Sequence, residues 1–345
     1  MRIRTGAVSF GMALVIGVVW ACVGCGDDGR DSGDRQRSPR DGGNGAGSAR
    51  GAAGHHTPTT STGSGAHVTT APSRVGLAPR QIEAAEAAGV PSRIEVDLGR
   101  GVRMVLVLIP PGAFLMGAPL HEEMREDDEP PHMVTLSAPV YLGATEVTQR
   151  QYERVTGANP SRYVGPDRPV ERVSWHEASA FCRRLTEAER SSGRLRDGEA
   201  YALPTEAVWE CACRAGTTAP FNLDGPLNTD RVNYDGHYLY GEEHKLHEAV
   251  WRHKTTPVAT FAPNPWGLWD MHGNVWEWCA DWYGPYATTA VADPAGPASG
   301  VNRVLRGGSW FDSPGDLRSA NRTAATPDNQ DGNIGFRVMR TVAAR

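Results

Sequence analysis

The sequence is short of two things: large aliphatic residues between positions 26 and 80, and clusters of basic residues. Between Gly26 and Arg80 the large aliphatic side chains are only Val68, Val75 and Leu77. Such a segment cannot bury enough apolar area to offset the entropy of ordering it, so residues 26–80 are predicted to be a disordered linker. A formal net charge of −5 without a basic cluster argues against nucleic acid as a partner.

Residues 1–25 have the features of an export signal. Arg2 and Arg4 precede an apolar run from Ala7 to Val23, which are the charged and apolar regions of such a signal. Small residues before Cys25 are typical of a lipoprotein, in which this cysteine is acylated and becomes the mature N-terminus. The alternative is an uncleaved membrane anchor, because the run is close to the minimum spanning length. Both interpretations predict an exported protein tethered to a membrane, with the lipid anchor placing it at a bacterial-type cell envelope.

Ordered sequence is predicted to begin near Gln81. Two β-like runs lie within Arg93–Ile109, and Thr148 is placed to cap a short helix that continues through Val155. Another helix is expected to start at Ser174, which forms a capping box with Glu177. Its apolar face includes Ala178, Phe181, Cys182 and Leu185.

A third helix is predicted between Leu203 and Gly216, after which periodic segments become rare. A domain of about 250 residues with so little regular structure needs other means of stabilisation, such as buried tryptophans or bound ions.

Five motifs in the folded part resemble those of one protein family. They are Pro110–Gly117, Glu146–Tyr152, Gly267–Trp282 (GLWDMHGNVWEWCADW), Arg306–Trp310 and Gly335–Arg337. In this order they resemble the formylglycine-generating enzymes, or sulfatase-modifying factors, from about residue 93 to residue 340. The resemblance implies one domain over residues 81–345. It also implies an irregular α+β fold with low regular secondary structure, related to C-type lectin folds.

The Gly267–Trp282 motif contains oxygen donors suited to calcium. Calcium takes about six to eight oxygens from carboxylates and backbone carbonyls, and here two carboxylates bracket a glycine turn. The resemblance implies a structural calcium held by the side chains of Asp270 and Glu277 and the carbonyls of Gly273 and Val275. The alternative is an aspartate turn beside a glutamate bound by backbone N–H groups. A second calcium site of the family would begin at Asn233 and Tyr234, although its later carboxylate does not align.

The copper site of the family's oxidases has no counterpart in this sequence. The resemblance implies two cysteines after Arg306–Trp310, and the matching positions are Asp312 and Leu317. Because Cu(I) prefers soft thiolates, copper is not expected and no catalytic residue is assigned. Iron would need histidines with a carboxylate, but no HxD or HxxxH pair stands out among His132, His176, His237, His244, His247, His253 and His272.

A ligand pocket is the remaining expectation. By resemblance its lining is Trp276, Ser309, Trp310, Asp312, Asp316, Arg318, Asn321 and Arg322. Tryptophan faces with Arg and Asp edges suit a glycan or an extended peptide, so a binding module is the favoured function. The alternatives are a non-haem iron enzyme and the oxygen-dependent formylglycine-generating oxidase itself. The opposing structural interpretation places both tryptophans in the core and pairs both arginines with nearby aspartates.

The cysteines of the folded part leave the disulfide state open. They are Cys182, Cys211, Cys213 and Cys279. An oxidising compartment permits disulfides, and four cysteines allow three full pairings that sequence does not rank. The resemblance implies C-terminal partners for Cys182 and Cys213, but Val338 and Arg322 occupy those positions, so that bridge pattern is absent.

Overall fold

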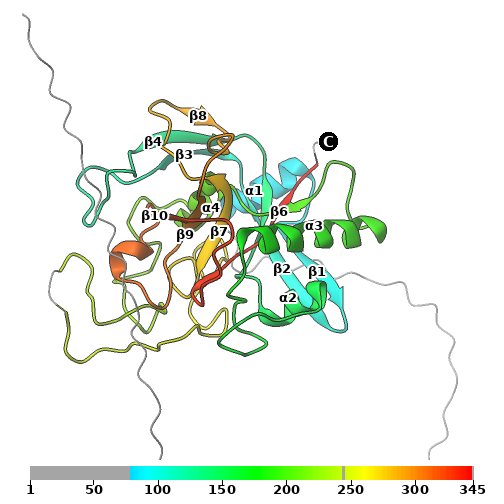
Figure 1. Ribbon diagram of the computed structural model, residues 1–345. Helices are drawn as coiled ribbons and strands as arrows, with labels where there is room; N and C mark the ends of the chain where they lie inside the picture. Colours follow the sequence, from blue (N-terminus) through cyan, green and yellow to red (C-terminus); the bar gives the residue numbers. More distant parts are fainter. Residues whose placement is uncertain (1–77, 243–244, 344–345) are drawn as a thin grey trace, which may run out of the picture. The chain divides into compact units, whose positions relative to one another are not determined.

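The structure is a computed structural model that describes residues 78–242 and 245–343 (Figure 1). Helices and short strands are joined by long irregular segments, which confirms the predicted α+β class. The export signal, Cys25, most of the predicted linker and His244 lie outside the described residues. Within the described ranges, no helix combines the length and the apolar character needed to cross a membrane.

The largest sheet has five strands in the order β1-β2-β5-β12-β6. β1 (Arg93–Gly99) and β2 (Val102–Ile109) form an antiparallel hairpin, which confirms the two predicted β-like runs. The other members are β5 (Val140–Gly143), β12 (Met339–Thr341) and β6 (Tyr201–Ala202). Because β12 lies between β5 and β6, this strand joins β6 to the rest of the sheet.

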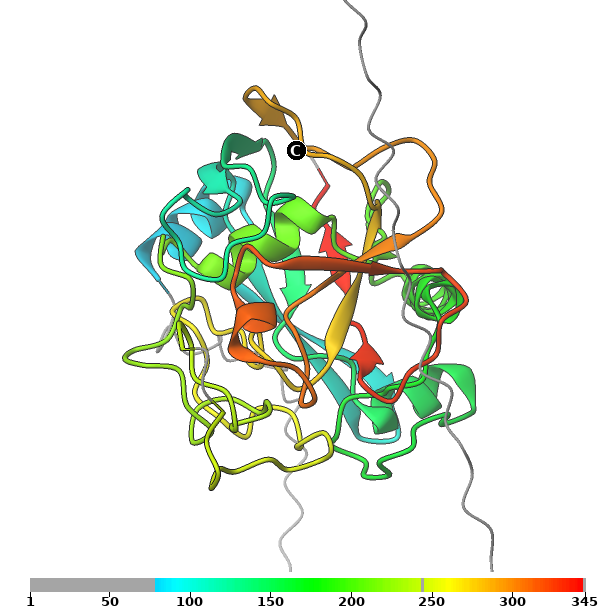
Figure 2. The same ribbon diagram turned by 60° about the vertical axis from the view of Figure 1, so that its left-hand side comes forward.

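Two smaller sheets complete the strand framework. A four-stranded sheet has the order β10-β9-β7-β11 and a three-stranded sheet the order β3-β4-β8. The first contains β7 (Trp276–Trp282), β9 (Arg303–Arg306), β10 (Arg322–Ala325) and β11 (Ile334–Gly335). The second contains β3 (Gly112–Met116), β4 (His132–Leu136) and β8 (Val291–Ala292). Figure 2 shows β7, β9 and β10 crossing the centre of the domain, so the tryptophan-rich motif supplies the central strand β7.

Helix boundaries follow the capping signals. α2 (Gln149–Thr156) begins after Thr148, whose hydroxyl accepts a hydrogen bond from the Gln151 amide. α3 (Trp175–Ser191) begins after Ser174 with the predicted capping box. α4 (Glu206–Arg214) ends before residues in the left-handed conformation, as predicted. α1 (Pro79–Ala88) starts inside the predicted linker, so the expected boundary at residue 80 is two residues too late. Proline at the first helical turn favours this start.

Helix α4 is buried along its whole length and organises the interior. Trp209 of α4 and Trp278 of β7 are fully buried, in agreement with the expected role of tryptophan. Phe181 and Cys182 of α3 lie in the core, as their spacing predicted.

Arginine–glutamate pairs are the other stabilising contacts. Five arginines of the described residues are almost fully enclosed, and each pairs with at least one glutamate: Arg214, Arg306, Arg318, Arg322 and Arg337. A buried charge is tolerated only when it is paired and hydrogen-bonded, so these long-range pairs fix the chain where regular structure is sparse.

The segment from residue 217 to residue 275 has neither a helix nor a strand among its described residues. It is the yellow-green and yellow coil beside the orange 3-10 turn η1 (Pro314–Leu317) in both ribbon views (Figures 1 and 2). The Asp235 amide donates to the Asp312 carbonyl at 3.1 Å, which joins this segment to the loop before η1. The two irregular regions are therefore in contact.

Candidate functional site

The loop after β9 is held at both ends by buried arginines. Arg306, the last residue of β9, donates to Glu210 of α4. Arg318, just after η1, donates to both oxygens of Glu129 at 2.7 Å each and to Glu122 at 2.9 Å. All of these side chains are buried. The two ends of the loop are therefore fixed to the interior by charged contacts.

Inside this 309–317 loop, the polar side chains bond to one another. Ser309 Oγ donates to Asp312, and Ser313 Oγ donates to Asp316 at 2.8 Å. Burial, together with the nearby Asp316 carboxylate, raises the pKa of Asp312 to about 6. These bonds hold the loop in one conformation.

Leu317 anchors the 309–317 loop to an apolar cluster. Its side chain is fully buried and packs with Val232 and Tyr234. A Cβ at Gly308 would lie 2.7 Å from the Leu317 side chain. Only glycine at this position therefore allows the Arg306–Trp310 motif to pack against η1. His272 Nδ1 donates to the Leu317 carbonyl at 2.7 Å.

Aromatic residues gather beside the loop. We call them the aromatic wall: Tyr163, Trp251, His253, Trp310 and Phe311. The Trp310 ring centroid lies 5.4 Å from Tyr163, 6.5 Å from Trp251 and 5.5 Å from Phe311. Trp251 stands 3.8 Å from His253 and donates its indole N–H to the Trp310 carbonyl at 3.0 Å. Phe311 is 55% exposed whereas Trp310 is 9% exposed, so the wall has a buried base and an open face.

The predicted calcium ligand Glu277 is fully engaged by protein groups. Its two oxygens accept hydrogen bonds from Arg337 Nε at 2.6 Å and from a terminal nitrogen of Arg337 at 2.5 Å. Trp209 Nε1 adds a third bond at 2.8 Å. The carboxylate therefore neutralises a buried arginine, a role that the motif did not indicate.

Asp270 lies in a group of carboxylates with Glu277 and Glu146. Asp270 accepts a hydrogen bond from the Ala259 amide at 2.8 Å. One Glu146 oxygen accepts from Asn274 at 3.0 Å, while the other is buried without a partner among the described residues. Burial and the neighbouring carboxylates raise the pKa of Glu146 well above its usual value, and burial also raises the pKa of Asp270 to about 6.

The residues of the doubtful second calcium site have structural contacts. Asn233 donates to the Lys254 carbonyl at 3.0 Å and to Asn274 at 3.2 Å, while its own side-chain oxygen is buried without a partner in the described part. Tyr234 is in the apolar cluster around Leu317. In residues 78–242 and 245–343, no three His, Cys, Asp or Glu side chains form a group suited to a metal ion.

Most of the predicted pocket residues are buried. Of those in the 309–317 loop, Ser309 and Trp310 are buried, whereas Asp312 and Asp316 are partly exposed. Those outside the loop are all buried: Trp276, Arg318, Asn321 and Arg322. Arg322 binds Glu206 through two hydrogen bonds of 2.9 and 2.7 Å, and Asn321 donates to Glu129 at 3.4 Å. The two arginines are thus paired, but with distant glutamates rather than the nearby aspartates.

Comparison with known proteins identifies the family. A family model described as "Sulfatase-modifying factor enzyme 1-like domain" matches residues 100–342. The chain belongs to this family. It is 38% identical over 192 residues to a formylglycine-generating enzyme of Streptomyces coelicolor, covering 54% of this chain and 57% of that protein. It is 32% identical to one from Thermomonospora curvata, covering 72% of this chain and 96% of that protein.

A solved structure supports the same fold. Treponema denticola variable protein 1 is 28% identical, with a TM-score of 0.59 over 72% of this chain and 99% of that protein. The resemblance stated from the motifs is therefore confirmed at the level of family and fold.

The cysteines of this sulfatase-modifying-factor domain lie away from the surface. Cys182, Cys211, Cys213 and Cys279 are all buried, and none of these four forms a disulfide. Cys213 contacts Ser319 Oγ at 3.5 Å and His272 Nε2 at 3.8 Å, a pair that sequence spacing did not predict. Burial raises the pKa of Cys213 to about 12 and lowers that of His272 to about 4. Both groups are neutral at pH 7, which disfavours nucleophilic chemistry.

Proposed function

We propose that this domain is an exported, membrane-tethered binding module that takes a peptide or glycan on its aromatic wall. The observation that carries the proposal is Phe311, a large apolar side chain that is 55% exposed on a loop fixed at both ends. Aromatic faces that combine an apolar body with nearby polar groups suit the apolar face of a sugar or an extended peptide. Asp312 supplies a polar group at the base of the wall.

The chemistry of the two copper positions favours binding over oxidation. Asp312 presents an oxygen that is bonded to Ser309, and Leu317 presents aliphatic carbon inside an apolar cluster. Neither is a soft ligand of the kind that Cu(I) requires. The thiol of Cys213 is buried with a raised pKa, so it is a poor substitute. For the non-haem iron alternative, His272 is unavailable as a ligand, because both of its ring nitrogens are used in hydrogen bonds.

The decisive enzymatic test is the conversion of a Cys-x-Pro-x-Arg peptide to formylglycine. Purified protein is incubated with Cu(I), oxygen and a thiol reductant, and the peptide is analysed by mass spectrometry. We expect no aldehyde above a control without protein, because Asp312 and Leu317 cannot bind Cu(I) as a dithiolate. Aldehyde formation by the wild-type protein would overturn the proposal and restore the oxidase.

The binding test uses a glycan array and a displayed peptide library, with the bound class then measured by calorimetry. Phe311→Ala should weaken binding about tenfold or more, as for an aromatic anchor at an interface, and leave the melting temperature nearly unchanged. Val301→Ala is the matched control. Val301 is 78% exposed and precedes the first residue of β9, whereas the 309–317 loop follows the last residue of that strand. Equal binding by the Phe311 variant and the wild type would exclude the aromatic wall.

We also propose a structural calcium near the 270–277 turn. The carboxylates of Asp270 and Glu146 would hold the ion, with the carbonyls of Gly273 and Val275, and Glu277 would remain with Arg337. The support is the buried Glu146 oxygen, which has no partner among the described residues, and the burial and neighbouring carboxylates that raise the pKa of Glu146. An oxygen-rich set of this kind matches the preference of calcium, and the ion would neutralise charge that burial otherwise makes costly.

A further inference from the structure

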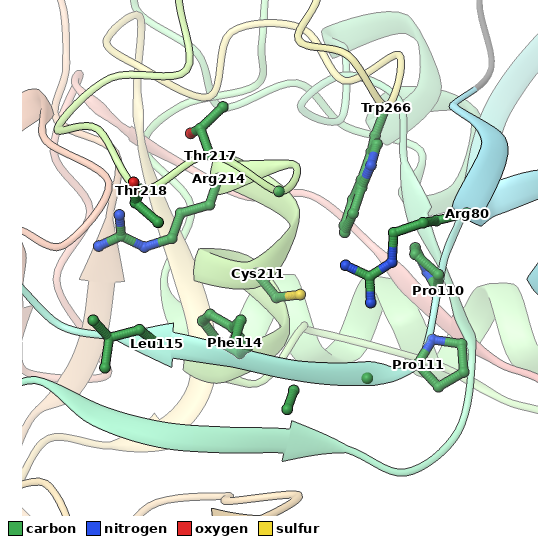
Figure 3. A pocket seen from close by; sticks show the side chains of 13 residues that line it. Arg80, Pro110, Pro111, Phe114, Leu115, Cys211, Arg214, Thr217, Thr218 and Trp266 are labelled. Atoms are coloured by element: carbon green, nitrogen blue, oxygen red, sulfur yellow. The ribbon is translucent and has the colours of Figure 1, made fainter.

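A separate cavity lies between the start of α1, the start of β3 and the end of α4 (Figure 3). Its volume is about 200 Å3, and its lining includes Arg80, Phe114, Cys211, Thr217 and Trp266. Neither the 309–317 loop nor the carboxylates near Asp270 contribute to this lining. The cavity is therefore distinct from the aromatic wall and from the proposed calcium site.

Arg80 gives the cavity an unneutralised positive charge. In the part of the chain that the structure describes, no carboxylate pairs with Arg80, and none of the lining residues is acidic. The other lining arginine, Arg214, donates a hydrogen bond to Glu210. The same carboxylate also accepts from Arg306, so its single negative charge is shared by two arginines. A concave site with an excess of positive charge favours an anionic ligand.

The backbone at Arg80 is held by its neighbour Gln81, while the Arg80 side chain is exposed. Gln81 Nε2 donates to the carbonyls of Leu108 and Trp266 at 2.9 and 3.0 Å, which ties the start of α1 to the cavity wall. A Cβ at Gly112 would lie 2.6 Å from the Arg80 guanidinium. The absence of a side chain at Gly112 thus makes room for the charged group over β3. In Figure 3 the guanidinium extends from α1 towards the side of the cavity that carries the Cys211 thiol.

The rest of the wall is apolar, apart from hydroxyl groups. Figure 3 shows the Trp266 ring, Phe114 and Pro111 arranged around the Arg80 head. The hydroxyl of Thr217 is buried and has no hydrogen-bond partner in the described residues. An unsatisfied buried hydroxyl carries a cost that a polar ligand atom removes.

We propose that this cavity binds a small carboxylate with an aromatic or short aliphatic body. Arg80 would take the carboxylate through its planar donor fork, and the body would pack between Trp266 and Phe114. The cavity volume of about 200 Å3 lies below the roughly 300–1,000 Å3 of sites for drug-sized ligands. A ligand smaller than a typical drug molecule therefore suits this cavity. Burial raises the pKa of Cys211 to about 12, so its thiol is neutral and adds no negative charge that would repel the ligand.

The first test is calorimetric titration of the full chain with benzoate and with its neutral analogue benzamide. We expect benzoate to bind and benzamide to bind about tenfold or more weakly, because it lacks the charged group. Arg80→Gln should lose benzoate binding by a similar factor, and Arg80→Lys should retain part of it. Arg93→Gln is the matched control, since Arg93 is exposed and does not line this cavity.

The second test locates the bound ligand directly. A crystal structure of the protein with benzoate should show the carboxylate at the Arg80 guanidinium and the ring between Trp266 and Phe114. Equal affinity for both probes, undiminished binding by Arg80→Gln, or benzoate bound away from this cavity would each overturn the proposal.

Discussion

At the scale of single residues, neighbours in the sequence have very different environments. Leu317 is fully buried among apolar side chains, while the next residue, Arg318, is fully buried against Glu129. Glu277 and Asp270 were both expected to bind calcium, yet Glu277 neutralises Arg337. Motif spacing identifies which residues converge, but it does not reveal which buried charge each one must balance.

The carboxylates near the 270–277 turn lead to a prediction on pH and calcium. The pKa of Asp270 in the folded protein is about 6, above the value of about 3.9 in an unfolded chain. Without calcium, this group therefore destabilises the fold progressively as pH rises from about 4 through about 6. Calcium should displace the proton, so its stabilisation should be larger at pH 7.5 than at pH 5.

Melting curves with EDTA or calcium at both pH values measure this effect. At a calcium concentration 100 times its Kd, the expected stabilisation is about 2.7 kcal/mol. Glu146→Gln should remove most of the response while raising the stability of the calcium-free protein at pH 7.5. Asp230→Asn is the control, because Asp230 is exposed. A response to EDTA that is unchanged in the Glu146 variant would exclude this residue as a ligand.

At the scale of elements, α4 illustrates how a polar helix is buried. Glu206 and Glu210 lie four residues apart and so on one face of the helix. They bind Arg322 and Arg306, which come from β10 and β9. The helix therefore joins the four-stranded sheet through charged contacts, while Trp209 packs into the core beside them.

This arrangement predicts a large effect of Glu210→Gln. Removing the charge of Glu210 leaves the positive charge of Arg306 buried with less negative charge to neutralise it. The loss of one partner of a buried ion pair costs about 3–5 kcal/mol. Urea unfolding measures the change in the free energy of unfolding. Glu187→Gln on the exposed side of α3 is the matched control and should change stability by less than about 0.5 kcal/mol. Equal stability of the two variants would contradict a structural role for the pair.

At the scale of the whole molecule, local signals were predictable and long-range pairings were not. The caps at Thr148 and Ser174 and the Arg93–Ile109 hairpin follow from interactions within a few residues, so the sequence alone predicts them. Trp251 could not be assigned to the aromatic wall, because it lies in a segment without periodicity. The Arg318–Glu129 pair spans 189 residues, and no local pattern encodes it.

The tether is also a property of the whole molecule. We expect the mature protein to fractionate with membranes and to begin at an acylated Cys25. Mass spectrometry of the N-terminal peptide measures this directly. Cys25→Ser should abolish the acylation, whereas Cys22→Ser should leave it intact. An unmodified, soluble N-terminus beyond Asp28 would contradict the lipoprotein interpretation.

The fixed ends of the 309–317 loop have a consequence for binding kinetics. Because Arg306, Arg318 and the Ser309–Asp312 bond already restrain the backbone, a ligand pays little conformational entropy to order it. Preorganisation of this kind raises affinity without enlarging the contact area. Complex formation should then follow a single-step association whose rate is limited by encounter rather than by loop closure.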